Sequence, residues 1–196
     1  MNSPTINLTF PHRWQARILP ARPLILPQRN FVYPAQAEEV ERGALEILIT
    51  FEPSHSQEKH SPSAQEFLAT CALGFADPIV PSGLWSCPKP EEICAVAGGY
   101  AYLINTVEPE QFTFLALRPV LSIHVAVAAQ RLIFVGHRGI LAWGPDGLAW
   151  DAGKLSDEGI TVARIDDTTL HGLGWEMMTD QETPFVLDLA TGQRCE

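Results

Sequence analysis

The sequence predicts an all-β protein in which antiparallel meanders form a β-sandwich or an open barrel. From Phe67 onward, short apolar runs follow one another with Gly, Pro, Asp or Asn at most of the joints, which is the pattern of strands connected by tight turns. No segment after Pro53 keeps a helical apolar stripe, which argues against strands alternating with helices around a nucleotide crevice. At 196 residues the chain is long enough for one β domain spanning residues 1–196, with about ten antiparallel strands.

The first element, residues 1–37, is predicted to be a basic, proline-rich, extended arm. It carries four arginines and no acid, and prolines interrupt every apolar piece, as in RILPARPLILP. Proline cannot donate to a strand ladder, so these pieces are expected to form edge strands or extended coil that lies over an acidic body.

The next element is a strand over residues 44–52. Val40, Ala44, Leu45 and Leu48 also fit one helical stripe, but residues 45, 47, 49 and 51 are apolar in alternation. Their β-branched members and the preceding Gly43 favour the strand. Residues 54–66, SHSQEKHSPSAQE, contain no large apolar residue to anchor them before Phe67, so we expect a mobile loop there.

The strands expected after this loop are short runs that cover most of the remaining chain. They are residues 67–75, 93–104, 112–117, 120–127, 131–136, 140–144, 148–152, 160–165, 169–175 and 185–189. The pair 140–144 and 148–152 forms a hairpin around the turn sequence GPDG, which suits a type I turn followed by a left-handed glycine.

This hairpin decides the role of Trp143 and Trp150. A three-residue loop with a bulge at Gly147 places Trp143 opposite Ala149 and Ala142 opposite Trp150, with the two indoles on opposite faces. A two-residue loop would place both indoles on one face, where they could form a ligand platform. The turn residues favour the first register, so we expect both tryptophans to be core residues.

Two phrases in the last third of the chain carry a family resemblance. DGLAW at residues 146–150 and LDLATGQ at residues 187–193 are similar to the strand-turn-strand phrases that end blades in quinoprotein and WD-type β-propellers. The resemblance covers residues 132–193 and implies antiparallel meanders, without implying a cofactor. It makes a small propeller-like array the alternative fold.

The charge of the chain indicates which classes of partner it can bind. The formal net charge is −10, and the chain after the arm holds 23 acids against 9 basic residues. This balance repels phosphates and anionic lipid, so we expect neither nucleic acid nor a membrane as partner. The N-terminal MNSPTINLTF lacks the basic and apolar regions of a secretory signal, and we expect a cytoplasmic protein.

The four cysteines show no CxxC pair, so reduced thiols are expected, without a metal or another cofactor. The most catalytic-looking neighbourhood is His171 with three acids, Asp166, Asp167 and Glu176, although no nucleophile motif accompanies it. Candidate ligand-binding residues are the two tryptophans and the pair His137 and Arg138 in the turn GHRG, where an anion could bind.

From these observations we expect a non-catalytic binding or protein-interaction module with a protein partner or self-association. The alternative is a hydrolase-type enzyme that uses His171 and the neighbouring carboxylates.

Overall fold

The protein is all-β, as the sequence predicts. The computed structural model describes residues 3–35, 42–51 and 66–195, and these residues form strands, turns and no helix. The strands make four open sheets, which lie in two compact units. The first unit comprises Met1–Ser86 and Pro90–Ala116, and the second comprises Cys87–Lys89 and Leu117–Glu196.

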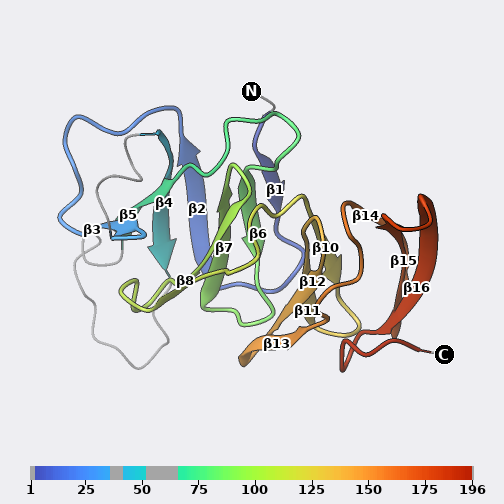
Figure 1. Cartoon of the computed structure of the whole chain (residues 1–196). Helices are drawn as coiled ribbons and strands as arrows, with labels where there is room; N and C mark the ends of the chain where they lie inside the picture. Colours follow the sequence, from blue (N-terminus) through green and yellow to red (C-terminus); the bar gives the residue numbers. More distant parts are fainter. Residues whose placement is uncertain (1–2, 36–41, 52–65, 196) are drawn as a thin grey trace. The chain divides into compact units, whose positions relative to one another are not determined.

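The first unit contains two sheets (Figure 1). Sheet 1 has the order β2-β4-β5-β3, and sheet 2 has the order β1-β6-β7-β8-β9. Their strands are β1 (Thr5–Asn7), β2 (Trp14–Leu19), β3 (Asn30–Tyr33), β4 (Ala44–Phe51), β5 (Glu66–Ala72), β6 (Gly83–Ser86), β7 (Glu92–Ala97), β8 (Tyr100–Asn105) and β9 (Phe112–Phe114).

The core of the first unit is shared by its two sheets. Ile47, Ile49 and Phe67 of sheet 1 pack in one buried cluster with Ile93 and Ile104 of sheet 2, among others. This face-to-face packing explains why the β4 and β5 runs are apolar, because alternate side chains of each strand reach the same core.

Buried tyrosines add polar links inside this core. The Tyr102 hydroxyl on β8 donates to the Ala72 carbonyl at the end of β5, at 2.9 Å, and therefore joins the two sheets. The Tyr33 hydroxyl donates to the Pro109 carbonyl at 2.8 Å. Burial raises the pKa of the Tyr33 phenol well above its usual range, so this group stays a neutral donor.

The proline-rich arm supplies edge strands. β2 and β3 are the two edges of sheet 1, and β1 is an edge of sheet 2. This confirms the edge positions that the prolines predict. β1 pairs with β6 and β3 pairs with β5 in parallel, so the expected purely antiparallel arrangement is wrong at these two edges. A segment that arrives from the arm can lie along an edge in either direction, because no tight turn constrains it.

The second unit also contains two sheets (Figure 1). Sheet 3 is a four-stranded meander of β10 (Ser122–Ala126), β11 (Arg131–Val135), β12 (Ile140–Gly144) and β13 (Gly147–Asp151). Sheet 4 contains β14 (Ile160–Ile165), β15 (Thr169–Glu176) and β16 (Gln181–Asp188). Ile133, Ala142 and Trp150 of sheet 3 share one buried cluster with Leu170 and Leu187 of sheet 4.

The β12–β13 hairpin differs from the expected one at its tip. Gly144 pairs with Gly147, and Trp143 pairs with Leu148, so the loop has two residues and the predicted pairing of Trp143 with Ala149 is wrong. Gly147 does have the expected positive φ, at 105°. A bulge between Ala142 and Trp143 then restores the predicted pairing of Ala142 with Trp150, which returns Trp150 to the face of Ala142.

The two tryptophans are core residues, as predicted. Trp143 is 6% exposed and Trp150 is 7% exposed. The Trp150 indole N–H donates to the Leu189 carbonyl at 2.8 Å. Gly192 lies against the same indole, since a Cβ at this glycine would lie 2.6 Å from Trp150 Cδ2. The sequences DGLAW and LDLATGQ therefore meet in the folded chain.

The turn that follows β16 is built by Asp188. Its Oδ1 accepts hydrogen bonds from the backbone N–H groups of Ala190 and Thr191 and from the Thr191 hydroxyl. The Thr191 donors hold the pKa of this carboxyl below its usual range. Gly192 has φ of 72°, which reverses the chain so that Arg194 pairs with Leu187.

The strand runs of the sequence correspond well to observed strands, but their number was underestimated. The described residues contain sixteen strands, against about ten expected from turn spacing. The run 93–104 is two strands, because Gly98 and Gly99 both have positive φ and form the turn between β7 and β8. Three further strands lie in the arm, and β6 was not predicted.

Two other predictions stay predictions. The mobile loop at residues 54–66 falls outside the described residues except for Glu66, which begins β5. That residues 1–196 form one domain also stays a prediction.

The described part of the chain contains no helix that is long and apolar enough to span a membrane.

The packing of Trp150 leads to the first testable prediction. Trp150→Ala should lower the free energy of unfolding by about 3 to 5 kcal/mol, because it opens a cavity between sheets 3 and 4 and leaves the Leu189 carbonyl without its donor. Urea denaturation measures this loss. Leu148→Ala, at an exposed position on the same strand, is the control and should change stability by less than about 0.5 kcal/mol. Equal, small losses in both variants would contradict the core assignment.

Candidate functional site

The structure brings His171 and Asp166 together at the β14–β15 hairpin. His171 Nε2 lies 3.2 Å from Asp166 Oδ2, 3.0 Å from the Thr169 hydroxyl and 3.0 Å from Arg164 Nη2. Arg164 Nε is 3.1 Å from the same Asp166 oxygen. Arg164 and Asp166 are exposed, and His171 is partly exposed. These four side chains form a solvated polar cluster.

The cluster does not have the geometry of a nucleophile-activating relay. In such a relay one ring nitrogen of histidine contacts the nucleophile and the other contacts the acid. Here the hydroxyl of Thr169 and the carboxylate of Asp166 both approach the same nitrogen, Nε2. One nitrogen cannot take a proton from a hydroxyl while it donates a proton to a carboxylate.

The other two acids predicted near His171 do not join this cluster. Asp167 is exposed in the adjoining turn. Glu176 lies five residues further along β15, at a distance of roughly 17 Å for an extended strand. Its Oε2 accepts a hydrogen bond from the Thr179 hydroxyl at 2.9 Å. Among the described residues, no group of His, Cys, Asp and Glu side chains has the arrangement that a metal ion requires.

The ligand platform, the alternative role of the two tryptophans, does not form either. Ala142 and Trp150 are cross-strand partners, whereas Trp143 is the neighbour of Ala142 and so belongs to the other face of sheet 3. Since both indoles are buried, neither presents a flat surface to a ligand.

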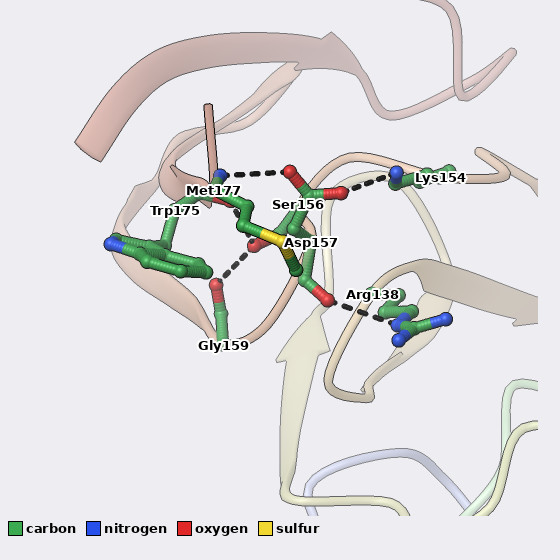
Figure 2. Close-up of polar contacts among 7 residues, drawn as sticks. All are labelled: Arg138, Lys154, Ser156, Asp157, Gly159, Trp175 and Met177. Carbon is green, nitrogen blue, oxygen red and sulfur yellow. Dashed lines mark hydrogen bonds and ion pairs between the residues drawn. The ribbon is translucent and has the colours of Figure 1, made fainter. Parts of the chain in front are cut away.

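His137 and Arg138 occupy an exposed turn between β11 and β12, but their backbone serves the fold. The Leu155 N–H donates to the Arg138 carbonyl at 2.7 Å, and the Gly159 N–H donates to the His137 carbonyl at 2.8 Å. The Arg138 side chain donates from Nε to the Asp157 carbonyl at 2.9 Å (Figure 2). The guanidinium is therefore engaged through Nε in a contact that supports the fold.

The segment 154–159 donates these backbone hydrogen bonds to the β11–β12 turn, and it connects sheets 3 and 4. Figure 2 shows Ser156 and Asp157 between Arg138 on one side and Trp175 and Met177 on the other. The Ser156 hydroxyl lies 2.7 Å from the Gly159 carbonyl and 3.0 Å from the Trp175 carbonyl. Because Ser156 is buried and its single proton faces carbonyl acceptors, it acts as a structural donor.

Asp157 is the charged centre of this junction. Its Oδ1 is ion-paired with Lys154, and its Oδ2 accepts the Met177 N–H at 2.9 Å (Figure 2). The Lys154 ammonium and the Met177 N–H together hold the pKa of Asp157 below its usual range. The junction thus fixes the start of the β15–β16 turn.

A different feature has the properties of a binding surface. The loop between β2 and β3, residues 20–29 with the sequence PARPLILPQR, displays three consecutive aliphatic side chains. Leu24 is fully exposed, Ile25 is 88% exposed, and Leu26 is also exposed. Single exposed aliphatic residues are common, but three in a row on one loop are a marker of an interaction site.

The start of this 20–29 loop is anchored to a buried carboxylate. Glu46 on β4 is buried in sheet 1, directly opposite Thr70 on β5, whose hydroxyl donates to Glu46 Oε2 at 2.7 Å. Arg22 Nη1 lies 3.5 Å from the Thr70 hydroxyl and 3.9 Å from Glu46 Oε1. A buried carboxylate needs such partners, so Arg22 has a defined position.

The end of the loop is anchored by Arg29. Its guanidinium carbon lies 5.8 Å from the ring centroids of Phe31 and Phe67 and 5.9 Å from that of Phe51, within cation–π range. Asn30 also donates from its side chain to the Pro27 carbonyl at 3.3 Å. With both ends held and three prolines inside, the loop displays its aliphatic tip in a restricted set of conformations.

This surface was not predicted, because the apolar pieces of the arm were expected to form edge strands or extended coil over the body. One signal was available. Pro23 and Pro27 bracket Leu24, Ile25 and Leu26, and proline on both sides prevents the run from entering a sheet as a central strand. An apolar run without a sheet to enter is either packed elsewhere or exposed.

Comparison with known proteins adds little. No family model and no curated protein matches the chain. Among solved structures, the chain is similar to one described as "Crystal structure of BBS1N in complex with ARL6DN, soaked with mercury", with 12% identity and a TM-score of 0.35. The match covers 97% of this chain and 53% of that chain, so this chain spans about half its length. The all-β assignment rests on the protein's own strands.

The depressed pKa of Asp157 leads to a prediction about pH. A carboxylate whose pKa is lowered by folding stabilises the protein above the pKa of the unfolded chain, about 3.9, and this contribution is lost as the pH falls through the folded-state value. Asp157→Asn should therefore lower the urea midpoint at neutral pH, and the gap from wild type should close below about pH 4.

The matched control is Glu158→Gln, which removes the neighbouring, exposed carboxylate. It should leave the midpoint nearly unchanged at every pH. A gap between wild type and Asp157→Asn that stays constant down to acid pH would contradict the role given to the ionised carboxylate.

Proposed function

We propose that the protein is a non-catalytic interaction module that binds a protein partner through the 20–29 loop. The observation that carries this proposal is the full exposure of Leu24 and the near-full exposure of Ile25 on a loop whose two ends are anchored. An anchored loop loses little further conformational freedom when it binds, and this favours association.

The free energy gained by burying the apolar tip of the loop is of the size expected for the central residues of an interface. Burying an aliphatic side chain contributes about 1.5 to 3 kcal/mol, so Leu24 and Ile25 together contribute about 3 to 6 kcal/mol. Association costs roughly 4 to 15 kcal/mol in lost rigid-body freedom. The loop therefore acts as the energetic centre of a larger contact that polar groups around it complete.

The charge distribution favours a protein over a lipid surface as the partner. The described residues 3–35 carry arginines at positions 13, 17, 22 and 29 and no acid, which suits an acidic partner. The whole chain, however, has a net charge of −10, and this opposes approach to an anionic membrane.

Site-specific photo-crosslinking tests the proposal. A photoreactive amino acid at position 25 of the full chain should give discrete adducts with one protein species, which mass spectrometry identifies. The purified partner should then bind wild type and lose about tenfold or more in affinity for Ile25→Asp. Since Ile25 touches little within the fold, the variant should keep its stability to within about 0.5 kcal/mol.

The same photoreactive group at position 79 provides the control, because Ile79 is also highly exposed but lies in another loop, between β5 and β6. Adducts that are equally abundant at both positions would reflect non-specific contact. That result, or unchanged affinity of Ile25→Asp for the identified partner, would contradict the proposal.

A further inference from the structure

The β15–β16 turn displays a second exposed apolar pair with the opposite charge. Met177 is 60% exposed and Met178 is 89% exposed. The turn segment 176–182 has the sequence EMMTDQE, with three acids and no basic residue. Methionine is a flexible, polarisable side chain that adapts to different apolar partners. This segment is called the acidic turn below.

The acidic turn is also held in place, in this case by hydrogen bonds. The Met177 N–H donates to Asp157 Oδ2 at 2.9 Å (Figure 2). The Trp175 indole N–H donates to Asp180 Oδ1 at 3.2 Å, and the Thr179 hydroxyl donates to Glu176 Oε2 at 2.9 Å. The two methionine side chains are thus displayed by a built turn.

The two surfaces are complementary in both of their properties. Each has an aliphatic or thioether centre of adjacent exposed side chains. Arg17 precedes the 20–29 loop, and Arg22 and Arg29 lie within it; Glu46 is the carboxylate paired with Arg22. The acidic turn holds three acids and no base, and the Lys154 ammonium near it is paired with Asp157. Opposite charges around apolar centres steer two surfaces together and fix their register.

We propose that the 20–29 loop of one copy docks on the acidic turn of a second copy. The proposal rests on the function given above, since it names the partner surface of the same loop. The two surfaces differ, so the contact is heterologous, and each added copy brings a further loop and a further turn. Assembly can therefore continue beyond two copies. Because rim charges take part, added salt should weaken it.

Sedimentation velocity over a range of protein concentrations tests this docking. For the wild-type chain at low salt, the weight-average mass should rise with concentration and pass twice the 21.6 kDa monomer. High salt should reduce it. Two double variants, Leu24→Asp with Ile25→Asp and Met177→Asp with Met178→Asp, should each remain monomeric at concentrations where wild type assembles.

Mixing the two double variants gives the sharpest result. The loop variant keeps an intact acidic turn, and the turn variant keeps an intact loop, so the mixture contains one complementary pair of surfaces. It should form a 1:1 complex that grows no further. Val127→Asp, at an exposed aliphatic position in the β10–β11 turn, is the control and should assemble like wild type.

Three results would overturn self-docking. The first is a wild-type chain that stays monomeric at all concentrations. The second is assembly that the Met177 and Met178 substitutions leave unchanged. The third is a pair of double variants that do not associate when mixed. If crosslinks from position 25 then reach another protein, the interaction function stands with a different partner. If instead the monomer binds phosphatidylserine vesicles through the loop, the occupant is a lipid surface, and self-docking and the proposed function both fail.

Discussion

Burial of the Trp150 indole is the constraint around which the second unit is arranged. Its ring packs in the core shared by sheets 3 and 4, its N–H donates to the Leu189 carbonyl, and Gly192 lies against its face. The bulge in the β12–β13 hairpin follows from this burial, because an unbulged ladder beyond the two-residue tip would turn the indole to the other face. The Asp188 turn brings Gly192 to the ring.

In the same unit, hydrogen bonds from a connecting segment hold an exposed turn in place. Segment 154–159 uses backbone donors, the buried Ser156 hydroxyl and the Asp157 carboxylate to join the β11–β12 turn to the end of β15. Gly174 permits this approach, since a Cβ there would lie 2.4 Å from the Leu155 carbonyl oxygen. The junction in turn holds the acidic turn in place. The first unit has a similar arrangement, because Glu46 and Thr70 hold Arg22 at the start of the exposed 20–29 loop.

Much of the fold is predictable from the sequence because local rules determine it. Alternation of apolar residues predicts β4, and Gly, Pro and Asp at the joints locate most strands after Phe67. The pairing of Trp143 was not predictable from the turn residues, because a three-residue loop and a two-residue loop followed by a bulge both place Trp150 opposite Ala142. The exposed tip of the 20–29 loop was not predicted, because residue types alone do not show whether an apolar run packs against other parts of the protein. The anchor Arg22–Glu46 joins residues far apart in the sequence. The cytoplasmic location stays a prediction.

The central claim is that the apolar tip of the 20–29 loop is both solvent-exposed and held in place. Nuclear magnetic resonance on dilute, monomeric protein with a soluble paramagnetic agent tests both properties together. The account predicts strong broadening of the Leu24 and Ile25 methyl signals and backbone order parameters near 0.85 for these residues, the value of rigid backbone. Methyl signals that the agent does not reach, or order parameters below about 0.6, would contradict it.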